Sequence, residues 1–243
     1  MELEIIVLVL LIFFVSTTIR SFFGFGDALL AMPLLTIVIG VKTAVPIVAL
    51  VAIIIGLSIL LKTWREINFK QLIPLIVASI AGIPIGLIYL KDTSEVIVKL
   101  VLAIILISFS LYRLFRPNLL YLKSERLSFI FGLFSGILGG AYNTNGPPIV
   151  LYGAMRRWEP SQFRSNLQGI FLPTNLFIAT GHGLAGFWTE EAIILFFYCI
   201  PVVILSIILG SYLNKRIPAE KFVKLVDIFL IIIGLVLVVH SLF

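Results

Sequence analysis

The chain has 243 residues, of which 60% are hydrophobic and 12% charged, and its mean hydropathy is +1.18. These values exclude a soluble globular domain and indicate an integral membrane protein. The net charge of +6 does not indicate a nucleic-acid-binding protein, because the basic residues lie in short loops between apolar runs, where they orient membrane helices. The single cysteine, Cys199, excludes a disulfide within the chain and argues against a metal cluster. We therefore expect no metal and no cofactor.

Ten apolar segments can be compared with the roughly 20 residues that a membrane-spanning helix needs. The first half of the chain contains residues 5–23, 28–41, 44–61, 72–90 and 96–115. The second half contains residues 127–141, 147–155, 163–180, 192–213 and 222–243. Glu2 and Glu4 precede the first segment, so we expect no removable signal peptide. The segments predict an N-terminal membrane repeat (1–116), a polar bridge (117–126) and a C-terminal membrane repeat (127–243).

The two halves share weak sequence similarity, which indicates a duplication. Tyr89-Leu90, followed by Val98-Lys99-Leu100-Val101, recurs as Tyr212-Leu213, followed by Val223-Lys224-Leu225-Val226. Trp64 likewise matches Trp188, and Gly86 matches Gly210.

Five segments in each half would insert the second repeat upside down in the membrane. Of the 18 Lys and Arg residues, all but Lys42, Lys91 and Lys99 lie around connections that this topology places on one side of the membrane. Basic residues favour the cytoplasmic side. We therefore predict an all-α, multi-pass protein of the cell membrane. It would contain two inverted five-segment repeats, a cytoplasmic bridge and both termini outside.

Each half contains an interruption of its apolar pattern, at residues 20–33 and 139–148. The spacing from Gly24 to Pro33 equals that from Gly139 to Pro148, so we align the two breaks on these residues. Lipid cannot satisfy the backbone groups of a broken helix, so both breaks should face protein or water, and we expect them to line one site. The first and second segments (5–23 and 28–41), and the sixth and seventh (127–141 and 147–155), would either cross the membrane fully or form re-entrant hairpins at the repeat interface.

The first break has the chemistry of an anion site. A broken helix offers free N–H groups and a positive dipole end, and an arginine adds a forked donor for oxyanions. The candidate substrate-binding residues here are Arg20, Gly24, Phe25, Gly26 and Asp27. Asp27 is also the candidate proton carrier. Alternatively, Arg20 would reach the membrane surface, and Asp27 would pair with Arg20 or cap the following helix.

The second break and segment 8 supply uncharged polar groups and one more arginine. The candidates at the break are Tyr142, Asn143, Thr144, Asn145 and Gly146. In the eighth segment (163–180), the candidates are Arg164, Asn166, Gln168 and Asn175. The alternatives are a plain turn at the break and interhelical hydrogen bonds from segment 8. His182 and His240 fall near the predicted outer face, and we expect both to be solvated.

Small residues recur every fourth position in Gly132, Gly136 and Gly140, and in Gly82 and Gly86. This spacing predicts close helix packing.

The glycine motifs resemble those of the sulfite-exporter TauE/SafE-type family of membrane transporters. The matching residues are Gly24-Phe25-Gly26-Asp27-Ala28-Leu29-Leu30 with Pro33-Leu34-Leu35, and Gly136 to Gly140 with Gly146-Pro147-Pro148. The resemblance covers essentially the whole chain and implies export or uptake of small sulfur-containing anions. Members of that family often have glycine where this chain has Asp27.

The sequence therefore predicts a secondary transporter that moves a small anion, such as sulfite or an organosulfonate, by alternating access. Its partners would be the anion, protons or Na⁺ as coupling ion, the bilayer and, in a homo-oligomer, further copies of the chain. The chain has no Gly-x-x-x-x-Gly-Lys-Ser/Thr motif of an ATP-driven pump. The alternatives are an anion channel and an intramembrane enzyme. We expect no enzyme, because Gly132-Leu133-Phe134-Ser135-Gly136 is one residue too long for Gly-x-Ser-Gly.

Overall fold

The computed structural model describes residues 2–67, 69–115, 121–122, 124–213 and 219–242. Most of the predicted bridge and the side chain of His240 lie outside the described residues. The described residues form helices and no strand. The α-helices are α1 (Leu3–Phe23), α2 (Asp27–Ile39), α3 (Val41–Thr63), α4 (Phe69–Asp92), α5 (Glu95–Phe115), α6 (Ser128–Tyr142), α7 (Gly146–Met155), α8 (Pro160–Leu184), α9 (Glu190–Leu213) and α10 (Ala219–Leu242). Two 3₁₀ turns, η1 (Trp64–Glu66) and η2 (Glu125–Leu127), connect them.

Among the described residues, five helices are long and apolar enough to cross a membrane: α1, α3, α4, α5 and α9. The prediction of an all-α membrane protein is confirmed. Helices α6 and α7 have 15 and 10 residues and are too short to span alone, whereas α1 has 21. The two breaks therefore differ, because a helix long enough to span leads into the first one and a shorter helix of 15 residues into the second.

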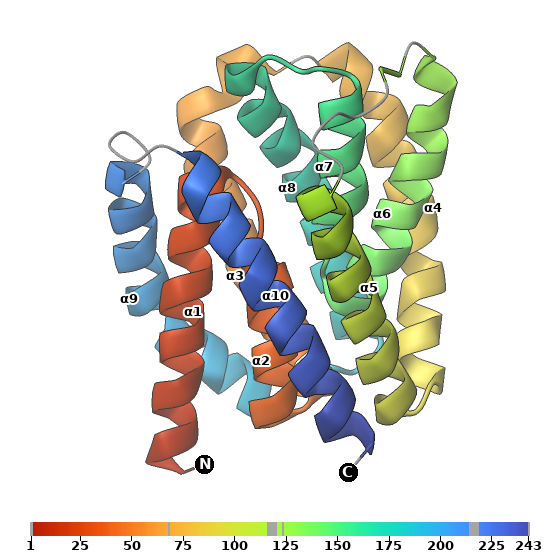
Figure 1. Cartoon of the computed structure of the whole chain (residues 1–243). Helices are drawn as coiled ribbons and strands as arrows, with labels where there is room; N and C mark the ends of the chain where they lie inside the picture. Colours follow the sequence, from red (N-terminus) through yellow and green to blue (C-terminus); the bar gives the residue numbers. More distant parts are fainter. Residues whose placement is uncertain (1, 68, 116–120, 123, 214–218, 243) are drawn as a thin grey trace.

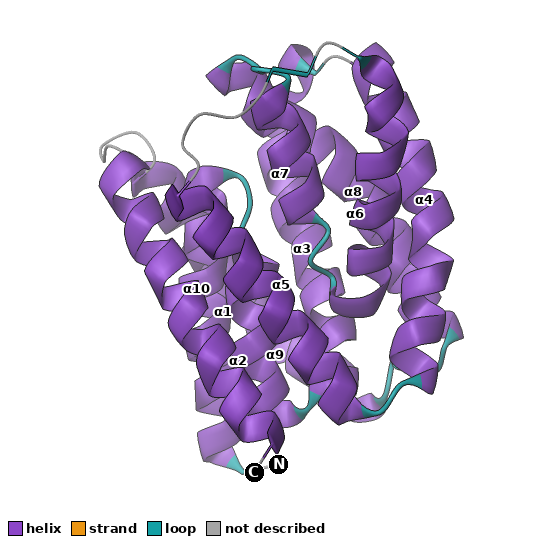
Figure 2. Cartoon of the chain, turned by 45° about the vertical axis from the view of Figure 1, so that its right-hand side comes forward, coloured by secondary structure: helices purple, strands orange, loops and turns teal. Residues whose placement is uncertain are grey.

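Both chain termini lie at the same end of the bundle (Figure 1). We call this the N/C end, and we call the opposite end, where α5 ends and α6 begins, the bridge end. Figure 2 shows α1, α2, α5, α9 and α10 on one side of the molecule and α4, α6, α7 and α8 on the other, with α3 between them. The largest hydrophobic core lies mainly within the first group and α3, and it also takes in Leu90 of α4 and Ala141 and Tyr142 of α6. A second cluster joins α4, α7 and α8.

Glycines allow α4 and α6 to pack backbone against backbone. A β-carbon on Gly136 would collide with the carbonyl oxygen of Ser79, and one on Gly140 with that of Ile83. The Ser79 hydroxyl donates to the carbonyl of Gly132 at 2.9 Å. The predicted small-residue packing is confirmed.

The same contact recurs between α9 and α1. A β-carbon on Gly86 of α4 would meet the carbonyl oxygen of Ile137 and the amide nitrogen of Ala141 in α6. One on Gly210 of α9 would meet the carbonyl oxygen of Thr18 and the amide nitrogen of Phe22 in α1. In both cases a glycine lies against a backbone oxygen and the backbone nitrogen four residues later.

The two breaks also share a backbone geometry. Helices α1 and α6 both end at a left-handed residue, Gly24 with φ 90° and Asn143 with φ 54°. After two more residues the next helix starts, at Asp27 and Gly146. By backbone geometry, Gly24 has the same place in its break as Asn143, four residues beyond the Gly139 that the glycine and proline spacing pairs with Gly24.

Candidate functional site

The first break buries an ion pair. Arg20, in the last turn of α1, is 3% exposed, and its Nη1 donates to Oδ2 of Asp27 at 2.7 Å. Asp27 is the first residue of α2, and no side chain caps that helix, whose N-cap residue is Gly26. Of the alternatives, the Arg20–Asp27 pair is confirmed. The other two are wrong, because Arg20 does not reach the surface and the Asp27 carboxylate binds Arg20 and not the helix end.

Gln168 of α8 extends this pair into a network. Its Oε1 accepts from Nη2 of Arg20 at 3.2 Å, and its Nε2 donates to the carbonyl of Gly24 at 2.6 Å. The ring of Phe171 lies 5.7 Å from the Arg20 guanidinium carbon. On the α3 side, Gly56 lies against the guanidinium, and a β-carbon there would be in van der Waals contact with Nη2 at 3.5 Å. The Arg20 Nε has no hydrogen-bond partner among the described residues and could donate to a ligand.

Arg164 of α8 adds a second cation next to the break. Its Nη2 donates to the carbonyl of Ser21 at 2.7 Å. Its side chain lies over Gly24, where a β-carbon would approach the Arg164 Cγ to 2.9 Å. Two guanidinium groups and one carboxylate therefore lie at this break. Two guanidinium groups next to one carboxylate make this break a candidate for binding an anion.

We expect Gly24→Ala to lower the thermal midpoint more than Gly186→Ala does. Both glycines are left-handed, with φ of 90° and 83°, so each alanine should cost roughly 1–2 kcal/mol in backbone conformation. A β-carbon at Gly186 has nothing within 4 Å, whereas one at Gly24 must displace Arg164. Losing the charged hydrogen bond from Arg164 to Ser21 adds about 1.5–3 kcal/mol. The thermal midpoints of the two variants are measured on protein in detergent. Equal midpoints would show that Arg164 is not held against Gly24.

The second break is uncharged and is tied to α8 by Asn145. The Asn145 Nδ2 donates to Oγ1 of Thr174 at 3.2 Å and to Oδ1 of Asn175 at 3.1 Å. The Asn145 carbonyl accepts from the Ser135 hydroxyl at 2.8 Å. For Asn175 of α8, this contact is the interhelical hydrogen bond that was expected as the alternative.

Asn143 and Thr144 are free to bind a ligand. Both side chains are buried, with 2% and 1% exposure, and neither Asn143 Oδ1 nor Thr144 Oγ1 has a partner among the described residues. An unsatisfied buried polar atom is costly, and a bound ligand or water would remove that cost. The neighbouring Tyr142 donates its hydroxyl proton to the hydroxyl of Tyr89 in α4 at 3.2 Å.

Both breaks contact the same helix. Gln168 meets the first break and Asn175 the second, and two turns of α8 separate them, or about 10 Å along the helix axis. Positions seven residues apart share a helix face. Helix α8 continues through Pro173 between them. The shared cavity that we expect between Gly26 and Asn143 remains a prediction.

The remaining candidate residues are Phe25, Gly26, Gly146 and Asn166. Gly26 is left-handed, with φ 101°, and Gly146 is the first residue of α7. Phe25 packs against the cluster of α4, α7 and α8. Asn166 is fully buried.

The expected exposure of His182 is wrong. His182 is 0% exposed. Helix α8 continues past the predicted end at residue 180 to Leu184, so His182 lies inside the helix and packs in the bundle. Its Nε2 lies 3.2 Å from the carbonyl of Gly140, and its ring packs against Phe187. The described residues contain no group of His, Cys, Asp and Glu that could hold a metal ion.

Sequence comparisons give a consistent assignment. The family model described as "Sulfite exporter TauE/SafE" matches residues 8–237. The chain is similar to the "Probable sulfite/organosulfonate exporter TauE" of Cupriavidus necator. The two are 23% identical over 214 residues, which cover 84% of this chain and 80% of that protein. No solved structure matches the chain.

Proposed function

The chain belongs to the TauE/SafE sulfite exporter family, and on that premise we propose that it is a secondary transporter that moves a small sulfur-containing oxyanion, such as sulfite or an organosulfonate, across the cell membrane. The first break carries the proposal. Two arginines and one carboxylate lie where α1 ends and α2 begins, and Arg20 keeps an unpartnered Nε in a buried position. The N-terminus of α2 adds a positive dipole end.

We propose that the anion binds between the two breaks. Arg20, Gly24, Gly26 and Gln168 would contribute from the first side, and Asn143 and Thr144 from the second. The guanidinium groups would bind the oxyanion, and the neutral groups would orient it. In contrast, Asn145 and Asn175 already bind one another, so we assign them to holding the second break against α8.

Alternating access by inverted repeats is the mechanism that we propose. Its support is the matching geometry of the breaks at Gly24 and Asn143, and the matching backbone contacts of Gly86 and Gly210. The helix pairs α4–α6 and α9–α1 pack correspondingly, while α3 packs on α8 and α5 on α10. A repeat axis that exchanges the halves would leave the last two pairs unchanged. The ion that drives transport would be the proton or Na⁺.

We expect the bridge to be cytoplasmic and the α8–α9 loop to be external, as the Lys and Arg distribution predicts. Single cysteines at Asn118 and Thr189, in a chain whose buried Cys199 is replaced by alanine, should react with an impermeant thiol reagent from opposite faces of the membrane. Labelling of both positions from one face would disprove the inverted topology.

Purified protein in liposomes tests the proposed function. A carrier should give saturable uptake of ³⁵S-labelled sulfite, and unlabelled sulfite on the opposite side should accelerate it. A channel would give flux without this acceleration, and an intramembrane enzyme would give no flux. Sulfate, methanesulfonate and acetate as competitors would define the anion class. If sulfite shows no saturable uptake, and sulfate, methanesulfonate and acetate show none when each is tested as the labelled anion, the proposal is rejected.

A further inference from the structure

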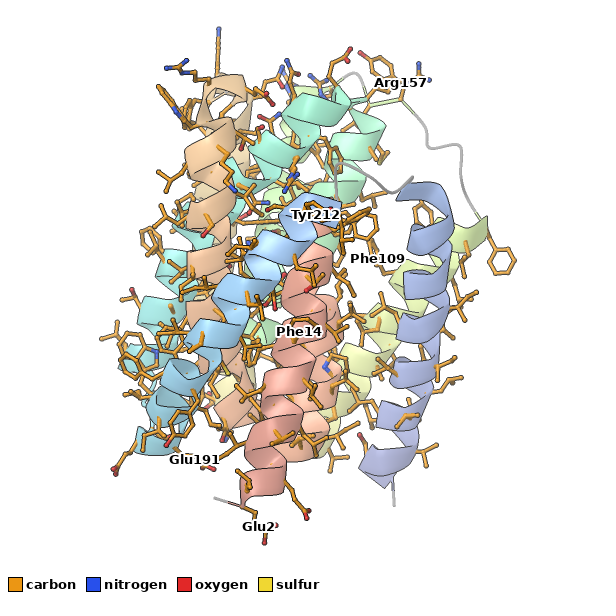
Figure 3. The ribbon with its side chains drawn as sticks, turned by 90° about the vertical axis from the view of Figure 1, so that its left-hand side faces the viewer. Glu2, Phe14, Phe109, Arg157, Glu191 and Tyr212 are labelled. Atoms are coloured by element: carbon orange, nitrogen blue, oxygen red, sulfur yellow. The ribbon has the colours of Figure 1, made fainter. Side chains whose placement is uncertain are left out.

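A cavity of about 430 Å³ opens between α3, α8 and α9. It lies at the ends of α3 and α9 and near the start of α8, and its lining residues are Ser58, Ile59, Lys62, Thr63, Arg164, Ser211 and Tyr212. Figure 3 shows Tyr212 toward the bridge end, on the side of Arg157 and away from Glu2 and Glu191. The volume is in the range of small-molecule sites.

Among the described residues, the cavity is lined by two cations and no carboxylate. The hydroxyl groups of Ser58 and Thr63 donate to carbonyls of their own helix at 2.8 and 3.2 Å, so the charges come from Lys62 and Arg164. The carboxylate closest in sequence, Glu66, accepts a hydrogen bond from Ser165 and does not line the cavity. A small anion is therefore the ligand that this lining favours.

Arg164 connects the cavity with the first break. The same side chain that lines the cavity covers Gly24 and bonds the Ser21 carbonyl. Gln168, one helical turn further along α8, binds both Gly24 and Arg20. Arg164 and Arg20 are therefore connected through Gly24 and Gln168, and an anion bound to Arg164 would pass from there to Arg20.

A second cavity, of about 610 Å³, has the opposite charge. It is lined by Ile6, Thr189, Glu190, Glu191, Ile194 and Tyr198 at the start of α9, and these residues include two carboxylates and no cation. Helix α9 therefore presents an anion-attracting cavity at the bridge end and an anion-repelling one at the N/C end. This asymmetry would favour capture at the first and release at the second.

We infer that the cavity between α3, α8 and α9 is an anion-recruitment site, separate from the ion pair at the first break, where Lys62 and Arg164 hold a small sulfonate or sulfite-like oxyanion before it reaches Arg20. This inference rests on the proposed function. It further implies that the anion enters from the bridge end, which the distribution of basic residues makes cytoplasmic, so the transporter exports.

A cysteine reporter tests the site without requiring transport. In the chain with Cys199→Ala, Ser211→Cys should react faster with an anionic methanethiosulfonate than with a cationic one of similar size. Lys62→Gln should lower the ratio of the two rates by about three- to tenfold, and Lys62→Arg should keep it. Lys91→Gln, which removes an exposed lysine at the N/C end of α4, should leave it unchanged. Methanesulfonate should slow labelling in the Lys62 protein and protect less after Lys62→Gln.

The outcomes separate this inference from the proposed function. An unchanged rate ratio in Lys62→Gln, or an equal change in Lys91→Gln, would overturn the recruitment site even if sulfite flux is intact. If the reporter responds but no anion is transported, the binding site stands and the transport proposal fails. With both intact, Lys62→Gln should raise the KM for sulfite several-fold from the bridge end alone and leave the maximal rate unchanged.

Discussion

Arg20→Ala is expected to weaken binding of a small sulfur oxyanion on the order of tenfold to a hundredfold. A buried guanidinium makes charge-assisted hydrogen bonds to an oxyanion, each with a net contribution of about 1.5–3 kcal/mol. Arg20→Lys keeps the charge and loses the fork, so it should recover part of the affinity. The measurement is the dissociation constant for sulfite, or the KM for sulfite flux, on detergent-purified protein with an unchanged elution profile.

Arg20→Ala also removes the partner of Asp27, and a buried carboxylate without a partner is strongly destabilising. The variant Arg20→Gln with Asp27→Asn removes both charges and keeps similar shapes, and it serves as the matched control. It should fold at least as well as Arg20→Ala and still bind sulfite weakly. Unchanged affinity in this folded double variant would show that the first break is architectural and would move the anion site to Asn143 and Thr144.

The elements of the fold could be predicted because every apolar segment became one helix. The boundaries were less predictable, and the largest shift is in α8, which extends from Pro160 to Leu184 and not from residue 163 to 180. Polar residues at both ends of α8 lower the hydropathy there, so the apolar pattern ends before the helix does. The bundle nevertheless buries one of these polar residues, His182. The glycine and proline spacing does not pair Asn143 with Gly24, because asparagine can replace glycine at a left-handed position.

The composition of the first break could also be predicted, and pairing of Asp27 with Arg20 was one of the interpretations, whereas the backbone geometry that makes the contact could not be predicted. In a continuous helix, Arg20 and Asp27 would lie two turns apart, about 10 Å, and could not form a 2.7 Å contact. The left-handed turn from Gly24 to Gly26 folds the start of α2 back toward Arg20. Phe171 and Gly56 had no sequence signal, because an apolar ring and a glycine are ordinary inside apolar helices.

Asp27→Asn is expected to bind sulfite and to lose transport driven by a pH gradient, while exchange of sulfite for sulfite continues. In the structure without a ligand, Asp27 occupies Nη1 of Arg20. An anion that takes over Nη1 in addition to the free Nε would displace this carboxylate, which would then lie buried without its cation. A buried carboxylate in that situation becomes neutral by taking up a proton. Binding of the anion would thereby be coupled to binding of one proton.

Asparagine keeps the shape of Asp27 and cannot take up that proton. Asp27→Asn should also bind sulfite several-fold more tightly, because the competing carboxylate is gone. Asp92→Asn, at an exposed position at the end of α4, is the matched control and should behave like the parent protein. Flux into liposomes under an imposed pH gradient, compared with counter-flow at equal pH, separates the two functions. Normal pH-driven flux in Asp27→Asn would instead make Asp27 a fixed counter-charge, with the anion bound by Arg164 and the free Nε of Arg20, and the coupling ion would then be sought in a Na⁺ gradient.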